Sequence, residues 1–275
     1  MKCFYHLDLD GICSAVIVKK KYPECELYGI NYGHDFPWDK ISKGEEVFMV
    51  DFCLQPFENM ERLNKISKLT WIDHHKTAID SAKEHNFSCD GEVEIGKAGC
   101  ELTWDYFHKE EEMPVAVRYL GRFDVWDLQD PDTMNFQVGM KIFENNPNDI
   151  DFWNLLFNDL SFVELIISRG KIIIEYQEQD YKRYCQAYAF ETNILDHRAI
   201  AMNRGGIGSN AFKSVWDEEK YDVMLAFSRM SNKLWTVSIF STKKDIDCGL
   251  IAKQLGGGGH FGAAGFTCET LPFRI

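Results

Sequence analysis

The sequence predicts an α/β protein with a parallel sheet in its N-terminal part and a second, smaller α/β domain towards its C-terminal end. Residues 1–76 alternate short β-rich runs with helix-compatible segments, the pattern of βαβ units around a mostly parallel sheet. After residue 192 β-rich runs return, with one short helical segment among them. The length of 275 residues is compatible with two ordinary domains.

Four strands are predicted in the N-terminal region, within the runs KCFYHL, ELYGINY, EEVFMVDF and LTWIDHH. The intervening segments GICSAVIVKKKY and PFENMERLNKISK have helical apolar spacing. Pro56 stands near the start of the second segment, where a missing N–H costs little. We expect these helices to connect neighbouring strands of one sheet.

The middle of the chain is predicted to be helical. Residues 97–144 include KAGCELTWDYFHKE and MPVAVRYLGRFDVWD, and the polar cluster ENNPND that follows is typical of a loop. The next long run, SFVELIISRGKIIIEYQEQDYKRYCQAYAF, has few helix breakers beyond Gly170 and could bridge two lobes. We therefore expect three segments, at 1–145, 146–191 and 192–275.

The C-terminal segment is predicted to hold strands in HRAIAMNR, YDVMLAFSRM and KLWTVSIFSTK, then a short helix in DCGLIAKQL. A glycine run follows this helix, from Gly256 to Gly259, with His260 directly after it. Backbone N–H groups of glycines can approach an anion closely, so the run is a candidate phosphate cradle. A bare glycine tract is also typical of a linker, but a linker does not need the HFGAAG that follows.

The composition of the chain limits which molecules it can bind. The net charge is -13, from 43 acidic and 30 basic residues, so the overall field opposes a long polyanion. A nucleic-acid substrate should therefore be short. The nine cysteines include no CxxC pair, which favours buried thiols in a reducing compartment. We see neither a signal peptide nor a membrane-spanning stretch, and we expect a cytoplasmic protein.

Ligand-type side chains gather where predicted strands end, which is where α/β proteins place their chemistry. Taken singly, these residues have ordinary explanations, because a strand-end Asp is usually a turn or helix N-cap and DHH could be a solvated turn. Together they are harder to explain without a ligand. The four places are His6, Asp8 and Asp10 in HLDLDG; Asp51 after EEVFMV; Asp73, His74 and His75 in DHH; and Asp124 in GRFDVWD.

The same residues predict a metal site. His6, Asp8 and Asp10 alternate, so they project to one side if the strand continues through them. Adjacent parallel strands would bring Asp51 and Asp73 to the same edge. Clustered carboxylates raise one another's pKa unless a cation lies between them. Oxygen and imidazole ligands suit manganese, magnesium or zinc, and the number of carboxylates suggests two ions that share an Asp.

This combination resembles the DHH phosphoesterases, in the nanoRNase-like and RecJ-like branch with a C-terminal GGGH domain. The resemblance rests on HLDLDG, Asp51, DHH at 73–75 and GGGGHFGAAG at 256–265, in the family's order. It implies a DHH metal-binding catalytic domain at 1–145, a helical connector at 146–191 and a DHH-associated substrate-binding domain at 192–275. The two lobes would face each other across a cleft, with two divalent ions, usually manganese, in the first.

The resemblance also implies roles for single residues. Asp51 would bridge the two ions, and Asp73 would orient a histidine while His75 faces the substrate phosphate. His260 and the backbone of Gly257, Gly258 and Gly259 would hold a phosphate or the nucleotide end. The ligands of one ion would be His6, Asp8 and Asp51, and those of the other Asp10, Asp51, His74 and Asp124.

Several positions depart from the family pattern or stay open. Asp127 competes with Asp124 as the fourth-motif ligand. Phe240 stands where the family often has an Arg, so it cannot clamp a phosphate but could stack on a base. Arg204 and Arg229 are alternative sources of the charge, although exposed arginines are more often solvated. His34 could reach the cleft, although an ordinary loop histidine is the commoner case.

The expected function is a manganese-dependent phosphodiesterase that releases nucleoside monophosphates from short oligonucleotides. The alternatives are a phosphodiesterase for cyclic or linear dinucleotides, an adenosine 3',5'-bisphosphate phosphatase, and a nucleotide-binding regulator of low turnover. Long duplexes and membranes are not expected partners, and an oligomer is possible.

Overall fold

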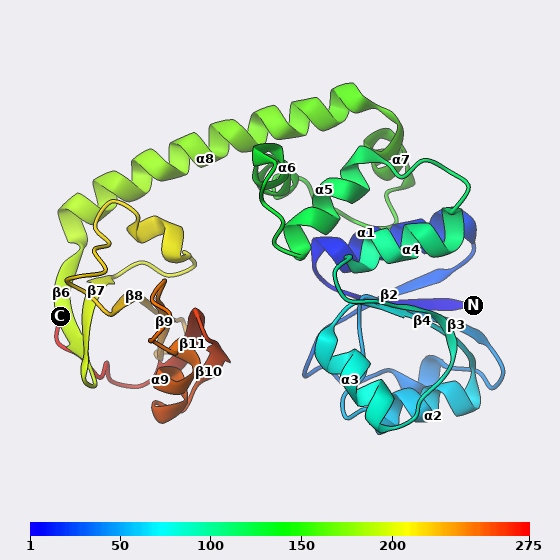
Figure 1. The fold of residues 1–275 in the computed structure, drawn as a ribbon, viewed down its shortest axis with the longest axis horizontal. Helices are drawn as coiled ribbons and strands as arrows, with labels where there is room; N and C mark the ends of the chain where they lie inside the picture. Colours follow the sequence, from blue (N-terminus) through cyan, green and yellow to red (C-terminus); the bar gives the residue numbers. More distant parts are fainter. The chain divides into compact units, whose positions relative to one another are not determined.

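The computed structural model describes all residues from Met1 to Ile275. The chain divides into two compact units, Met1–Ile174 and Glu175–Ile275, each with its own β-sheet (Figure 1). This mixed α/β architecture confirms the predicted fold class. The division falls inside the long helix α8 (Leu160–Tyr188), within the segment 146–191 that the sequence predicts as a connector. The three functional segments stay a prediction.

The first unit is built on a five-stranded parallel sheet, in the order β2-β1-β3-β4-β5. Its strands are β1 (Lys2–His6), β2 (Glu26–Ile30), β3 (Glu46–Val50), β4 (Lys68–Asp73) and β5 (Asp90–Val93). The four predicted strands are all present, and β5 is an addition. All neighbours pair in parallel, so β1, β3 and β4 end side by side.

Helices cover both faces of this sheet. One face packs on α1 (Leu9–Lys21) and α4 (Gly99–His108), and the other on α2 (Glu58–Ile66) and α3 (Lys76–Glu84) (Figure 1). The apolar strands explain this, because successive side chains point to opposite faces. In β1, Cys3 and Tyr5 pack towards the α1 and α4 side, and Phe4 packs towards the α2 and α3 side.

A further helical layer lies on the outer side of α1 and α4. It is formed by α5 (Val115–Asp124), α6 (Pro131–Met140), α7 (Ile150–Asn158) and the first half of α8. Its buried core includes Leu120, Phe136, Trp153 and Ile166. This layer fixes the end of α5, which carries Asp124, against the sheet unit.

The second unit contains a mixed six-stranded sheet, in the order β10-β11-β9-β8-β7-β6. Only β7 and β8 pair in parallel. Helix α9 (Cys248–Gln254) packs on one face, and the end of α8 packs on the other. The strands are β6 (Phe190–Ile194), β7 (His197–Met202), β8 (Val223–Arg229), β9 (Trp235–Phe240), β10 (Gly258–His260) and β11 (Ala263–Cys268).

Three further findings bear on the sequence expectations. The glycine run is not a free loop, because Gly258–His260 form β10 and pair antiparallel with β11. All nine cysteines are free thiols, and seven of them are buried. No helix has both the length and the apolar character needed to cross a membrane.

Candidate metal centre

The carboxyl ends of three neighbouring strands converge on one cluster. Strand β1 ends at His6, β3 is followed by Asp51, and β4 ends at Asp73 with His74 and His75 next in sequence. These strands are adjacent in the sheet, in the order β1-β3-β4. The parallel arrangement therefore places all these side chains at one edge, as the strand-end rule predicts.

The first stretch reaches this edge differently from the way its alternation suggests. The strand does not continue past His6: Asp8 is the N-cap of α1, and its Oδ1 accepts a hydrogen bond of 2.9 Å from the N–H of Gly11. Asp is a favoured N-cap, and this local preference ends the strand. Glycine is needed at position 11, because a Cβ there would lie 2.3 Å from the carbonyl oxygen of His6.

Asp10 is buried against the start of α4. Its carboxylate accepts hydrogen bonds from the N–H groups of Gly99, at 2.8 Å, and Cys100, at 2.7 Å. These first N–H groups of a helix have no partner within the helix and favour an anion. A Cβ on Gly99 would lie 2.7 Å from the Cβ of Asp51, so glycine at this point lets the helix approach both carboxylates.

Asp51 is the most constrained residue of the cluster. Its φ is 53°, a left-handed conformation that typically costs a non-glycine residue about 1–3 kcal/mol. The side chain is 1% exposed, and neither carboxylate oxygen has a hydrogen-bond partner. Burial, and then the charges of Asp10 and Asp8, raise the pKa of Asp51 well above its usual range. A buried carboxylate without a partner is costly, and a cation bound in the cluster would offset that cost.

Two imidazole nitrogens face the same carboxylates. His74 Nε2 lies 3.2 Å from Asp51 Oδ1 and 3.1 Å from Asp124 Oδ2. His6 Nδ1 lies 2.6 Å from Asp8 Oδ2 and 3.9 Å from Asp51 Oδ2. Both nitrogens are buried, and neither has a hydrogen-bond partner. Nitrogen and oxygen atoms so close without hydrogen bonds are arranged as the ligands of a shared cation would be.

Three overlapping groups in this cluster could hold a metal ion. Within each group the candidate ligand atoms lie within 4.8 Å of one another, and Asp51 and His74 each belong to two groups. Carboxylate and imidazole donors together suit divalent manganese, magnesium or zinc. The groups are His6, Asp8 and Asp51; Asp10, His74 and Asp124; and Asp51, His74 and His75.

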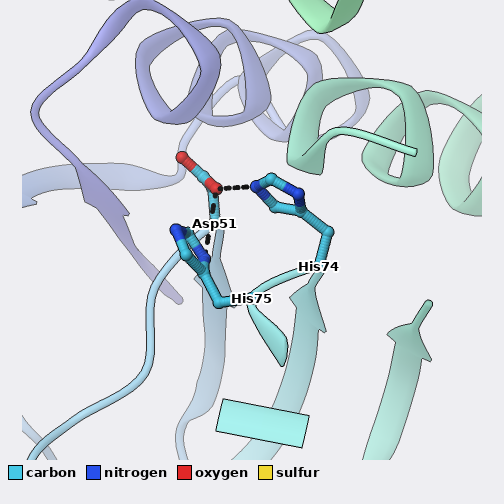
Figure 2. Close-up of side chains that lie close together, drawn as sticks. All are labelled: Asp51, His74 and His75. Carbon is cyan, nitrogen blue, oxygen red and sulfur yellow. Dashed lines mark ion pairs between the residues drawn. The ribbon is translucent and has the colours of Figure 1, made fainter. Parts of the chain in front are cut away.

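Asp73 organises the DHH turn. Its Oδ1 accepts hydrogen bonds from the backbone N–H of His74, at 2.7 Å, and of His75, at 3.0 Å, and lies 2.7 Å from His75 Nδ1. The hydrogen bond with Asp73 raises the pKa of His75. Figure 2 shows the result, with the Asp51 carboxylate close to the rings of both histidines. Asp73 itself belongs to none of the three groups, which is compatible with an orienting role.

Asp124 is the last residue of α5, and its carboxylate points into the cluster. Burial, and then the charges of Asp10 and Asp8, raise its pKa to about 7. The competing candidate, Asp127, belongs to no group of potential ligands. Asp127 lies three residues beyond the end of α5. Its backbone N–H donates a hydrogen bond to the carbonyl of Arg122.

Asn31 is a contributor that the sequence analysis missed. Its Oδ1 lies 3.3 Å from His6 Nε2, so a proton on Nε2 would leave Nδ1 free to face Asp8 and Asp51. Such outer contacts commonly fix the orientation of a ligating histidine. Asn31 directly follows β2, so the strand-end rule that selected Asp51 could also have found it.

The remaining candidates lie outside the cluster. Gly257, Gly258, Gly259 and His260 belong to the second unit, where His260 is exposed and joins none of the three groups. In the same unit, Phe240 packs against the core of the sheet. Arg204 is paired with Asp180 at 2.8 Å, and Arg229 lies over the ring of Trp235. His34 is exposed in the loop after β2.

Comparisons with known proteins agree on the fold. No family model matches the chain. An uncharacterized protein of Acanthamoeba polyphaga mimivirus is 26% identical over an alignment of 264 positions, which covers 86% of this chain and 57% of that protein. The chain therefore spans little more than half the length of this relative.

Two solved structures cover nearly the whole chain. The pGpG-specific phosphodiesterase PggH from Vibrio cholerae has a TM-score of 0.57 and 10% identity, over 97% of this chain and 92% of that one. The DHH domain of a member of the S1p family of ribosomal proteins has a TM-score of 0.56 and 15% identity, over 96% of this chain and 81% of that one. The chain thus has the fold of a DHH-domain protein, as the sequence resemblance implies.

Proposed function

We propose that this protein is a manganese-dependent phosphodiesterase that hydrolyses short oligonucleotides to nucleoside monophosphates. The observation that carries this proposal is the cluster at the sheet edge, in which Asp51 and two imidazole nitrogens are buried without hydrogen-bond partners. The likeness of the fold to a pGpG-specific phosphodiesterase supports the same class of reaction.

The donor set fits two divalent cations. His6, Asp8 and Asp51 would hold one, and Asp10, His74 and Asp124 would hold the other, with Asp51 shared between them. When bound, such a pair supplies a water of lowered pKa and positive charge opposite the phosphate oxygens. Several carboxylates here have raised pKa values or no partner of their own, so the chain provides the negative charge that two cations need.

His75 is the residue we assign to the substrate phosphate. Its side chain is about one third exposed, and its Nδ1 is held by Asp73 at 2.7 Å. The raised pKa favours the protonated ring, which can bind a phosphate oxygen or give a proton to the leaving oxygen. In the second unit, we assign His260 and the backbone of Gly257, Gly258 and Gly259 to a phosphate or the nucleotide end, because glycine N–H groups can approach an anion closely.

Short substrates are favoured over long ones. The net charge of -13 opposes a long phosphate backbone, which binds mainly through basic side chains. A linear dinucleotide is the shortest oligonucleotide, and the likeness to the pGpG-specific enzyme makes it the first substrate to examine.

Product analysis tests the proposal. Purified protein with manganese is incubated with RNA and DNA from dinucleotides to long single strands, with linear and cyclic dinucleotides, and with adenosine 3',5'-bisphosphate. We expect mononucleotides to appear fastest from oligomers of two to five residues, and not in the presence of a chelator.

The other outcomes assign other functions. Release of phosphate from the bisphosphate alone would indicate a phosphatase, and cleavage of cyclic dinucleotides alone would indicate a cyclic-dinucleotide phosphodiesterase. Absence of any cleavage, in a sample that binds manganese and nucleotides, would leave the low-turnover regulator.

A further inference from the structure

A pocket lies beside the candidate metal centre, formed by the loop after β2 and the segment after β3. It has a volume of about 160 Å³. Aromatic rings line it in two pairs: Tyr32 packs on Phe52 with ring centroids 4.6 Å apart, and Phe36 packs on Trp38 at 4.7 Å. No residue of this pocket belongs to the groups that could hold a metal ion.

The pocket directly adjoins His6. Asn31 and Tyr32, which both line it, contact the imidazole: Asn31 through its Oδ1, and Tyr32 edge to face with ring centroids 5.7 Å apart. Phe52, which packs on Tyr32, has its ring centroid 5.9 Å from that of His6. A ligand in the pocket is therefore separated from the metal-facing nitrogen of His6 by a single layer of side chains.

The polar groups of the pocket suit a neutral heterocycle and not a phosphate. Asp35 is the only lining residue with a permanent charge, although the guanidinium of Arg62 lies 3.8 Å from the ring centroid of Trp38. A negative charge would repel a phosphate but can accept a hydrogen bond from an amino group. His34, Gln55 and Asn59 complete the lining with side chains that can donate and accept.

The volume corresponds to one ring system. An apolar cavity of about 150 Å³ is known to hold a benzene ring, so a pocket of about 160 Å³ can take one planar aromatic group but not a whole nucleotide. Aromatic walls are also what single-stranded nucleic-acid binders use to stack bases.

We propose that this pocket, lined by Tyr32, Phe36, Trp38 and Phe52, binds a nucleobase of the substrate while the adjoining phosphate lies at the metal centre. The inference rests on the proposed function for the identity of the ligand. It explains why an exposed tyrosine, a histidine and an aspartate follow β2 at the catalytic edge of the sheet. It also adds a determinant of substrate binding in the first unit.

Kinetics with matched substrates provides the first test. The probes are a 5'-phosphorylated adenine dinucleotide and its two analogues in which one or the other base is replaced by an abasic unit. Loss of one stacked base should lower kcat/KM about 5- to 150-fold for one of the two analogues. Tyr32→Ala should cause a loss of similar size with the intact dinucleotide and little further loss with that analogue.

Two more variants distinguish loss of base binding from a general effect on activity. Asn59→Phe should fill the pocket without removing an aromatic wall and give the same selective loss. Tyr106→Ala is the matched control, because Tyr106 lines a separate pocket with Glu46 and Lys68, where β3 and β4 begin. Tyr106→Ala should leave kcat/KM unchanged, or reduce it by the same factor, for the intact dinucleotide and both abasic analogues.

Binding of adenosine or guanosine provides a test that does not depend on hydrolysis. Nucleosides carry no phosphate, so they can report on the pocket in the metal-free protein. We expect either one to shift NMR resonances of Trp38 and Tyr32, and Asn59→Phe to abolish the shifts. Nucleoside binding without any phosphodiester cleavage would retain the pocket and refute the proposed function.

Cleavage without base binding would overturn the inference about the pocket and leave the proposed function intact. Cleavage of the dinucleotide with equal losses from Tyr32→Ala on the intact and both abasic substrates, together with no nucleoside-induced shifts, would show that the pocket does not read a base.

Discussion

Two buried or half-buried aspartates, one in each unit, show opposite electrostatics. Asp222 of the second unit lies 3.2 Å from Arg198 Nη2 and 3.0 Å from Lys243 Nζ. The hydrogen bond from Arg198 is the main reason that the pKa of Asp222 lies well below its usual range. Asp51 of the first unit has no Lys or Arg partner, and burial raises its pKa.

The difference separates a carboxylate that is paired within the fold from one that the fold leaves without a cationic partner. The chain itself supplies the cations for Asp222, so this charge stabilises the fold in the absence of any ion. Around Asp51 the neighbours are Asp8, Asp10 and Asp124, which add negative charge. Such a cluster is stabilised when its carboxylates are protonated or when a cation is bound among them.

The largest expected effect comes from Asp51→Asn. Removal of a ligand shared by two cations should lower kcat/KM about a thousandfold or more, since metal ions supply several kcal/mol of charge stabilisation in such reactions. In metal-free protein the same variant should raise the melting temperature, because it removes a buried charge without a partner and Asn tolerates a positive φ.

Steady-state kinetics with manganese and thermal melts with a chelator measure the two effects. Lower stability of the metal-free variant would contradict the view of Asp51 as an uncompensated charge.

Asn31→Ala should act through His6. Loss of the contact with His6 Nε2 frees the ring to turn, and outer contacts of this kind are typically worth about 10- to 100-fold in metal affinity or activity. Titration calorimetry with manganese measures the affinity. Asn64→Ala is the matched control, because Asn64 donates to the carbonyl of Ser88, away from the cluster. Equal manganese affinities in the two variants would remove Asn31 from the site.

The melting temperature of metal-free protein should depend on pH in a direction set by the cluster. The pKa values of Asp10 and Asp51 are raised by burial, and that of Asp124 is raised to about 7. Protonation is therefore easier in the folded state than in the unfolded state. The associated stability is present below the unfolded pKa, near 4, and is lost as the pH rises through the folded values.

We expect metal-free protein to melt several degrees lower at pH 8 than at pH 5.5, and manganese to raise the melting temperature more at pH 8. Calorimetric scans at both pH values, with and without a chelator, measure this. A metal-free melting temperature that rises between pH 5.5 and pH 8 would contradict the assignment of these carboxylates.

The smallest expected effect comes from Asp222→Asn. The ion pairs with Arg198 and Lys243 are partly exposed, so their loss should cost about 1 kcal/mol and lower the melting temperature of the second unit by about 2–8 °C. Because the folded pKa is lowered, this stability exists above the unfolded pKa and is lost as the pH falls through about 4 and below. Manganese affinity should not change. A change in that affinity would break the contrast with Asp51.

Much of the fold could be read from local patterns. The strands around His6, Asp51 and Asp73 were predicted because each is a short β-rich run bounded by polar residues. The long helix α8 was predicted because its segment has few breakers beyond Gly170. Strand β5 and the pairing of Gly258–His260 were missed, since DGEV is polar and a glycine run carries no alternation.

The candidate site divides in the same way. Asp51, Asp73 and the DHH histidines could be found because a strand end is a local feature that is visible in the sequence. The path of HLDLDG was only half right, because capping of α1 by Asp8 ended the strand at His6. Asn31 has the same strand-end signal, but as a neutral side chain it did not suggest a metal ligand.

The sequence by itself determined which elements form and which ligand-type residues stand at their ends, since both depend on spacing along a few residues. The tertiary structure decided how those residues combine. Asp10 meets the N–H of Gly99 across 89 positions of sequence, and packing of α5 directs Asp124, not Asp127, towards His74. Such contacts join segments that no local pattern connects, because only the folded core brings them within hydrogen-bonding distance.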